Sequence, residues 1–109
     1  EYANFYCAMA YPGSPLHAQV SKENPSVLPE NTPCGWLGYS QHAYDSLPLP
    51  TATLTAQEIL DIRDEAWMAY FTRPEYIEMM RSTFGDGVVK QIEHMTSFGK
   101  PKRKHREKP

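Results

Sequence analysis

The sequence lacks the residue spacings that metal sites and nucleophilic pairs normally show. It has only two cysteines, Cys7 and Cys34, which lie 27 positions apart. None of its His and Cys residues stands in a Cys-x-x-Cys or His-x-x-x-His arrangement. We therefore expect no metal ligand and no catalytic Cys–His pair within this chain. Structural or solvent-exposed roles are predicted for the six residues concerned, which are Cys7, Cys34, His17, His42, His94 and His105.

The sequence also lacks a signal peptide and any apolar run long enough to span a membrane. We therefore expect a cytoplasmic protein with reduced thiols and no membrane partner. The chain starts at Glu1 without an initiator methionine, and this start favours a piece of a longer protein.

Positive charge is scarce outside the C-terminus. The last ten residues, 100–109, carry six Lys/Arg and one Glu, a net charge of +5, whereas the remainder carries five Lys/Arg and twelve Asp/Glu, a net charge of −7. A nucleic-acid-binding domain needs a basic face on the fold itself, so no nucleic-acid partner is expected. The tail has no apolar residue to bury and is predicted to be disordered. An adaptor that binds nucleic acid through this tail is the open alternative.

Residues 54–71 carry the strongest helix signal in the chain. Thr55 and Glu58 stand in capping-box order, and Leu54 and Ile59 are spaced for a hydrophobic staple. Apolar residues then recur at helical spacing, which predicts one buried stripe: Ile59, Ile62, Ala66, Trp67, Tyr70 and Phe71. The acidic residues fall mainly on the other side, and a solvated face is predicted for them: Asp61, Asp64 and Glu65.

Three further helices are predicted from their end signals. Ser14 is a suitable N-cap before Pro15 for a short helix to about Lys22. Pro74 opens a helix that passes through Met79, Met80 and Phe84 and stops at Gly85. Asp86 is predicted to cap a final helix that Gly99 ends, with an apolar stripe of Val88, Val89, Ile92, Met95 and Phe98.

The first eleven residues form a continuous aromatic and apolar run that ends at Pro12-Gly13. Such a run is typical of a strand that is buried on both faces, as in a parallel sheet. A buried helical turn is the alternative. The rest of the chain offers no second strong strand, so we expect the strand's partners to lie upstream. The fold class is therefore mainly α, with one N-terminal strand, a Pro-rich connection and a C-terminal three-helix extension.

Two motifs resemble a known enzyme family. The run Asn4–Leu16 is similar to the strand followed by Pro-Gly-Ser/Thr-x-Leu that ends the partial β/α barrel of radical S-adenosylmethionine enzymes. The second motif resembles the C-terminal part of the cobalamin-binding radical enzymes related to the anaerobic protoporphyrin ester cyclase. It consists of Trp36–His42, Pro48–Thr51, Arg63–Ala66, Tyr70-Phe71, Pro74–Tyr76 and Phe84-Gly85. Together the two motifs cover about residues 1–99.

The resemblance implies an enzyme with an N-terminal cobalamin domain and a radical domain. In that family a Cys-x-x-x-Cys-x-x-Cys triplet holds a 4Fe-4S cluster that cleaves S-adenosylmethionine, and the resulting radical abstracts hydrogen from a small-molecule substrate. This chain contains neither the triplet nor a cobalamin motif. It is expected to contribute the last barrel strand and a helical cover, to bind no cluster and to be inactive alone. Its expected partner is the rest of its own radical domain upstream.

The resemblance also divides the chain and points to candidate residues. Residues 1–22 would end the barrel, 23–53 would form a Pro- and aromatic-rich connection, 54–99 the helical extension and 100–109 the basic tail. Active sites of such barrels lie at the C-terminal ends of the strands. Contact with S-adenosylmethionine or substrate is therefore implied for Tyr11, Pro12, Gly13 and Ser14. Helix capping by Ser14 and a simple turn at Gly13 remain the alternative.

A lid over the site is the implied role of Tyr39, Gln41 and His42, and ordinary loop packing is the alternative. No catalytic residue is assigned to this chain. Two other functions stay open, namely a small helical protein-interaction module that uses the Trp67/Phe71 stripe and the tail-based nucleic-acid adaptor.

Overall fold

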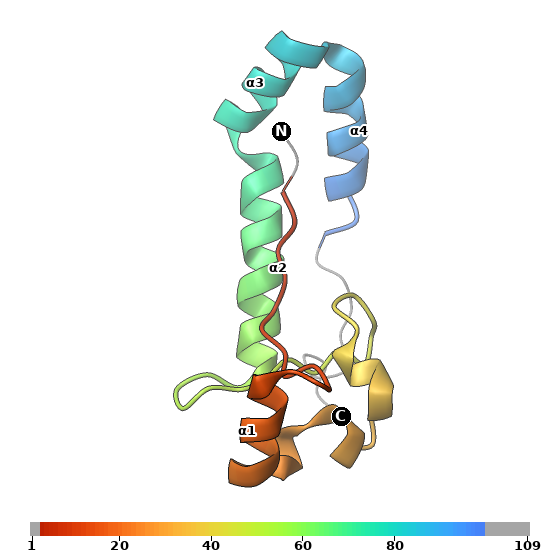
Figure 1. The fold of residues 1–109 in the computed structure, drawn as a ribbon. Coiled ribbons are helices and arrows are strands. Elements are labelled where there is room, and N and C mark those ends of the chain that lie inside the picture. The colour runs from red at the N-terminus through yellow and green to blue at the C-terminus, as the bar shows by residue number, and fades with distance from the viewer. Residues whose placement is uncertain (1–2, 100–109) are drawn as a thin grey trace. The chain divides into compact units, whose positions relative to one another are not determined.

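The computed structural model describes residues 3–99, and within this range the chain is helical and irregular, without a β-sheet. The elements follow one another in the order α1 (Pro15–Glu23), η1 (Pro25–Val27), η2 (Pro29–Asn31), η3 (Gly35–Tyr39), α2 (Ala56–Thr72), α3 (Pro74–Phe84) and α4 (Asp86–Thr96), where η marks a short 3₁₀ helix (Figure 1). None of these helices is long and apolar enough to cross a membrane. The predicted basic tail lies outside the described residues.

The chain divides into two compact units. The first unit consists of residues 6–61, and the second consists of residues 3–5 and 62–99 within the described range. Helix α2 begins in the first unit and ends in the second.

The predicted mainly helical fold is confirmed, and local signals explain where the helices begin and end. The Ser14 hydroxyl accepts a hydrogen bond from the His17 amide at 3.1 Å, so α1 begins as predicted with Pro15 in its first turn. The capping box of α2 is also formed, because Thr55 and Glu58 exchange side-chain to backbone bonds of 3.1 and 3.2 Å.

Gly85 separates α3 from α4, as its sequence signal predicts. Its φ of 90° lies in a region that residues with a side chain rarely adopt. The predicted cap at Asp86 does not form, because its carboxylate accepts from Arg81 Nε at 3.2 Å instead. Phe98 follows the end of α4 and is 75% exposed, so the buried stripe of this helix ends at Met95.

The predicted strand over residues 1–11 does not appear among the described residues 3–11, which form no sheet. The segment is nevertheless extended (Figure 1), and in the first unit it alternates between exposed Tyr6 and Ala8 and buried Cys7 and Met9. A strand needs a partner for its backbone groups, and the described residues supply no second strand.

Each unit has its own apolar core. In the second unit Phe71 is completely buried, and it packs in one cluster with Tyr76, Met80 and Ile92, with Trp67 partly buried beside them. The first unit has two smaller clusters. One contains Cys7, Met9 and Leu60, and the other contains Ala10, Val20 and Leu28.

The prediction of which side chains of α2 are exposed is partly wrong. Asp64 is buried and paired with buried Arg63, whereas Ile62, which was placed on the apolar stripe, is 53% exposed. Helical periodicity defines the sides of a helix, but which side is covered depends on the segments that pack against it.

Candidate functional site

A connected group of polar and aromatic side chains lies in the first unit around Glu30. One carboxylate oxygen of Glu30 accepts from His17 Nε2 at 2.7 Å, and the other accepts from the Tyr39 hydroxyl. The Tyr39 ring lies 5.8 Å from the Tyr11 ring, and Gln41 Nε2 donates to the Tyr11 hydroxyl at 2.8 Å. We call these five residues, His17, Glu30, Tyr39, Tyr11 and Gln41, the Glu30 cluster.

Three short elements position the carboxylate and its two donors. His17 belongs to the first turn of α1, Glu30 to η2 and Tyr39 to the end of η3. The elements η2 and η3 approach closely at Gly38, where an added Cβ atom would lie 2.6 Å from the Pro29 Cβ atom. Only glycine fits this contact, which brings the neighbouring residues Glu30 and Tyr39 within hydrogen-bonding distance.

Glu30 and the Tyr39 phenol shift one another's pKa in opposite directions. Burial acts to raise the pKa of Glu30, but hydrogen bonds from Tyr39 and His17 outweigh burial and lower it below its usual value. Burial raises the pKa of Tyr39, and the hydrogen bond to Glu30 and its negative charge raise it further. Around neutral pH the site therefore holds an ionised carboxylate and a protonated phenol that donates to it.

Gln41 connects the cluster to the extended segment. Its side-chain oxygen accepts from the Cys7 amide at 2.8 Å, and its side-chain nitrogen donates to the Cys7 carbonyl at 2.9 Å. On the next residue, the Ala8 carbonyl accepts from the Leu49 amide at 3.1 Å. Successive residues of an extended chain direct their backbone groups to opposite edges, so the loop that contains Gln41 and Leu49 covers both edges at this point.

Aromatic rings extend the cluster to the surface. The Trp36 ring stacks on the Tyr39 ring at 5.8 Å, and Trp36 is 66% exposed. Tyr11 is also exposed, at 44%. The Glu30 cluster thus combines a fixed internal carboxylate with two accessible ring surfaces, an arrangement suited to holding a flat or apolar group against Tyr11 and Trp36.

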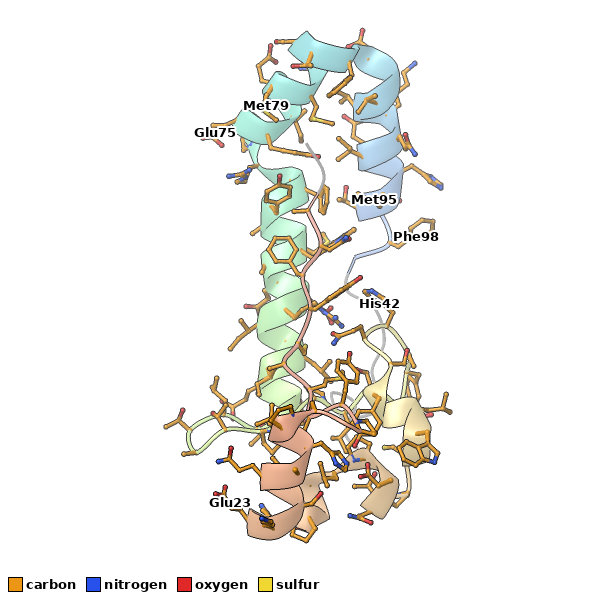
Figure 2. All side chains as sticks on the ribbon, in the orientation of Figure 1. Glu23, His42, Glu75, Met79, Met95 and Phe98 are labelled. Carbon is orange, nitrogen blue, oxygen red and sulfur yellow. The ribbon has the colours of Figure 1, made fainter. Side chains whose placement is uncertain are left out.

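The structure brings three of the candidate residues together, namely Tyr11, Tyr39 and Gln41. His42 lies apart from them in the loop after η3 (Figure 2), where it is exposed and its ring meets the Tyr6 ring edge-on at 5.9 Å. Pro12 and Gly13 form an exposed turn. The Ser14 hydroxyl accepts from the His17 amide, which caps α1. The same hydroxyl donates to the Tyr11 carbonyl at 2.6 Å in the preceding turn.

Sequence reasoning missed His17 and Glu30 as members of a polar cluster. They lie 13 positions apart on different elements, and no periodic pattern relates them. The sequence analysis gave His17 a structural or solvent-exposed role and did not select Glu30, because neither residue belongs to a motif.

The described residues 3–99 do not form a metal centre. Among residues 3–99, no three His, Cys, Asp or Glu side chains are grouped so that they could hold an ion. Cys7 and Cys34 are both buried and form no disulfide. An apolar hollow of about 340 Å³ lies beside Cys34 and is lined mainly by Val27, Pro33, Leu47 and Pro50, and no residue of the Glu30 cluster belongs to its lining.

Searches of protein-family models, curated proteins and solved structures find no match to this chain.

Proposed function

We propose that this chain is the C-terminal part of a radical S-adenosylmethionine enzyme of the cobalamin-binding type. In this proposal it supplies the last strand of the barrel and a helical cover. The remaining radical domain, upstream, is its partner. The whole enzyme would hold a 4Fe-4S cluster, S-adenosylmethionine and cobalamin and act on a small-molecule substrate.

The observation that supports the proposal is the backbone hydrogen bonding of the extended segment. Among the described residues, none forms a hydrogen bond with the backbone of Asn4, Phe5 or Tyr6. Backbone groups of a buried strand must be paired, and residues 4–6 therefore have the open edges that neighbouring barrel strands would pair with. The Pro-Gly turn and α1 follow directly, in the strand–turn–helix order that the family resemblance implies.

The chain's own thiols do not fit the cluster of this family. A cluster of this kind is held by cysteine thiolates gathered in one pocket, and three are implied by the resemblance. This chain has two cysteines, and both are buried, one in the extended segment and one before η3. We therefore assign the cluster ligands to the upstream part and assign no metal role to Cys7 or Cys34.

Within the proposal, the contact of this chain with S-adenosylmethionine or substrate lies at Tyr11. This residue ends the extended segment, and active sites of barrels lie at the carboxyl ends of the strands. The exposed ring of Tyr11 is fixed through Gln41 and Tyr39, so it is the residue of the Tyr11–Ser14 set best placed to contact a ligand. Tyr39, Gln41 and His42 would form the adjacent lid, with Tyr39 and Gln41 acting through Tyr11.

Anaerobic reconstitution of a longer polypeptide tests this function. The upstream coding sequence is expected to contain Cys-x-x-x-Cys-x-x-Cys. The longer polypeptide should take up iron and sulfide, absorb visible light as a 4Fe-4S protein and cleave S-adenosylmethionine, whereas residues 1–109 alone should do none of these. Within the longer polypeptide, Tyr11→Ala should weaken S-adenosylmethionine or substrate binding, and Tyr44→Ala, a change at another exposed tyrosine, should not. An upstream sequence without the triplet would disprove the proposal.

A protein-interaction module is the second candidate. The Trp67/Phe71 stripe expected to receive its partner is not available, because Phe71 is completely buried in the core. Another feature of the second unit favours this candidate. Four large apolar side chains of the second unit are exposed by 45–75%, namely Ile62, Met79, Phe84 and Phe98, and Figure 2 shows Met79 on α3 and Phe98 after α4. Concentration-dependent self-association or co-purification of a stoichiometric partner that is lost in Phe84→Ala would support this candidate.

A further inference from the structure

The second unit contains a buried cation whose hydrogen-bonding capacity is only partly used. Arg63 on α2 is 6% exposed, and its Nε–H donates to Asp64 Oδ1 at 2.9 Å. Its two terminal nitrogens, Nη1 and Nη2, are buried and form no hydrogen bond within the part of the chain that the structure describes. Four N–H donors of a permanently charged group are therefore enclosed without an acceptor.

The helix that carries Arg63 cannot supply the missing acceptors. Side chains at positions three and four before or after a helical residue are its neighbours on the helix surface. For Arg63 these are Ile59, Leu60, Ala66 and Trp67, and none of them has an oxygen acceptor in its side chain.

Arg81 on α3 shows the normal situation for comparison. It is partly exposed, and its Nε and Nη1 atoms donate to Asp86 and Glu78 at 3.2 and 3.0 Å. The remaining donors of Arg81 can bond to water because this side chain is 45% exposed, whereas Nη1 and Nη2 of Arg63 are buried and need an acceptor that another group brings to them.

From this geometry we infer that Arg63 is an oxyanion-binding residue whose Nη1 and Nη2 atoms take up a carboxylate group. The two amino groups of a guanidinium present parallel N–H bonds at the separation of the two oxygens of a carboxylate. Asp64 holds the Nε side and so fixes the plane of the guanidinium. Asp64 is therefore a positioning residue, and the Nη end is the binding end.

Two sources can supply such a carboxylate. One is a small carboxylate from solution. The other is an Asp or Glu side chain of the upstream radical domain, and only this second source rests on the proposed function. The chemistry of recognition is the same for both, so the experiment has one arm for each source.

The first arm measures the melting temperature of the full 109-residue chain in sodium acetate against sodium chloride at equal ionic strength. An anion that binds the folded state raises the melting temperature progressively with its concentration. The response should be present in the wild type, weaker in Arg63→Lys, which keeps the charge without the planar fork, and absent in Arg63→Met. Arg81→Met is the matched control and should keep the wild-type response. If Arg63→Met does not fold, the double change Arg63→Met/Asp64→Leu removes the charge pair together.

The second arm follows the ¹⁵N-bound Hη protons of Arg63 by NMR. A downfield shift in the 109-residue chain on adding acetate identifies a small carboxylate as the source. The same shift in the longer polypeptide in chloride alone identifies a protein carboxylate. If wild type and Arg63→Met respond equally to acetate, and the Hη signals move in neither arm, the inference is overturned. Because the acetate arm uses the 109-residue chain, its result is independent of whether the upstream cysteine triplet exists.

Discussion

The side-chain amide of Gln41 pairs with both backbone groups of Cys7, through bonds of 2.8 Å from the Cys7 amide and 2.9 Å to the Cys7 carbonyl. This is the pattern in which one residue of a neighbouring antiparallel strand would pair with Cys7. A single side chain thus takes the place of a strand at the point where the extended segment enters the first unit. The same side chain also donates to Tyr11, so it links the segment to the Glu30 cluster.

The change Gln41→Leu should destabilise the first unit. It removes the partners of two backbone groups of a buried residue, and a buried polar group without a partner costs about 1–3 kcal/mol. Urea unfolding should show a loss of this size or more. The matched control is Gln19→Leu, because Gln19 is exposed and its side-chain amide donates to exposed Glu23 at 3.3 Å; a change within about 0.5 kcal/mol is expected there. Equal effects of the two changes would contradict the role assigned to Gln41.

Acid should weaken the fold partly through Glu30. Its pKa in the folded chain is lowered from the usual 4.5, so its contribution to stability is present above about pH 4.5 and is lost as the pH falls through the folded value. The free energy of unfolding, measured from pH 6 downward, should therefore fall less steeply for Glu30→Gln than for the wild type. Parallel curves for the two proteins would show that the carboxylate is not held by His17 and Tyr39.

Tyr39 should stay protonated when other phenols ionise. Burial and the contact with Glu30 raise its pKa above 10, so its contribution to stability is present below pH 10 and is lost as the pH rises through the folded value. Tyrosinate absorbance at about pH 11 should therefore be the same for Tyr39→Phe and for the wild type, although one of seven tyrosines is missing. Glu30→Gln should increase this absorbance. A loss of one-seventh in Tyr39→Phe would contradict the raised pKa.

The core of the second unit should depend on Phe71. This side chain is completely buried among Tyr76, Met80 and Ile92, and Phe→Ala changes at such sites cost about 3–5 kcal/mol. Phe84→Ala is the control, since Phe84 is 57% exposed on α3, and its effect should stay within about 0.5 kcal/mol. Denaturant titration of both variants measures the difference, and a Phe71→Ala effect below 1 kcal/mol would disprove the packing.

The helices could be predicted because their signals are local. The capping box at Thr55 and Glu58, the cap at Ser14 and the stop at Gly85 each involve residues within a few positions of one another, and all three form as predicted. The burial of Arg63 and Asp64 could not be predicted in this way. Charged residues are normally exposed, and their burial depends on segments that are distant in sequence.

The Glu30 cluster was predicted only in part, for a related reason. Tyr11, Tyr39 and Gln41 were selected as candidates through family motifs, whereas His17 and Glu30 carry no motif. Their contact depends on the close approach of η2 and η3 at Gly38. Three consecutive 3₁₀ helices have no repeating pattern from which this approach could be inferred. The strand expected at residues 1–11 is a different case, because its partners are proposed to lie upstream.

Hydrogen exchange at Asn4, Phe5 and Tyr6 tests the central claim most directly. The amides of these residues have no hydrogen-bond partner among the described residues, so in the 109-residue chain they should exchange at nearly the rate of an unfolded peptide. In the longer polypeptide that includes the upstream radical domain, barrel strands should pair with them and slow the exchange by at least about a hundredfold, as expected for core strands. Exchange that stays equally fast in both proteins would contradict the proposal that this segment is the last strand of a barrel.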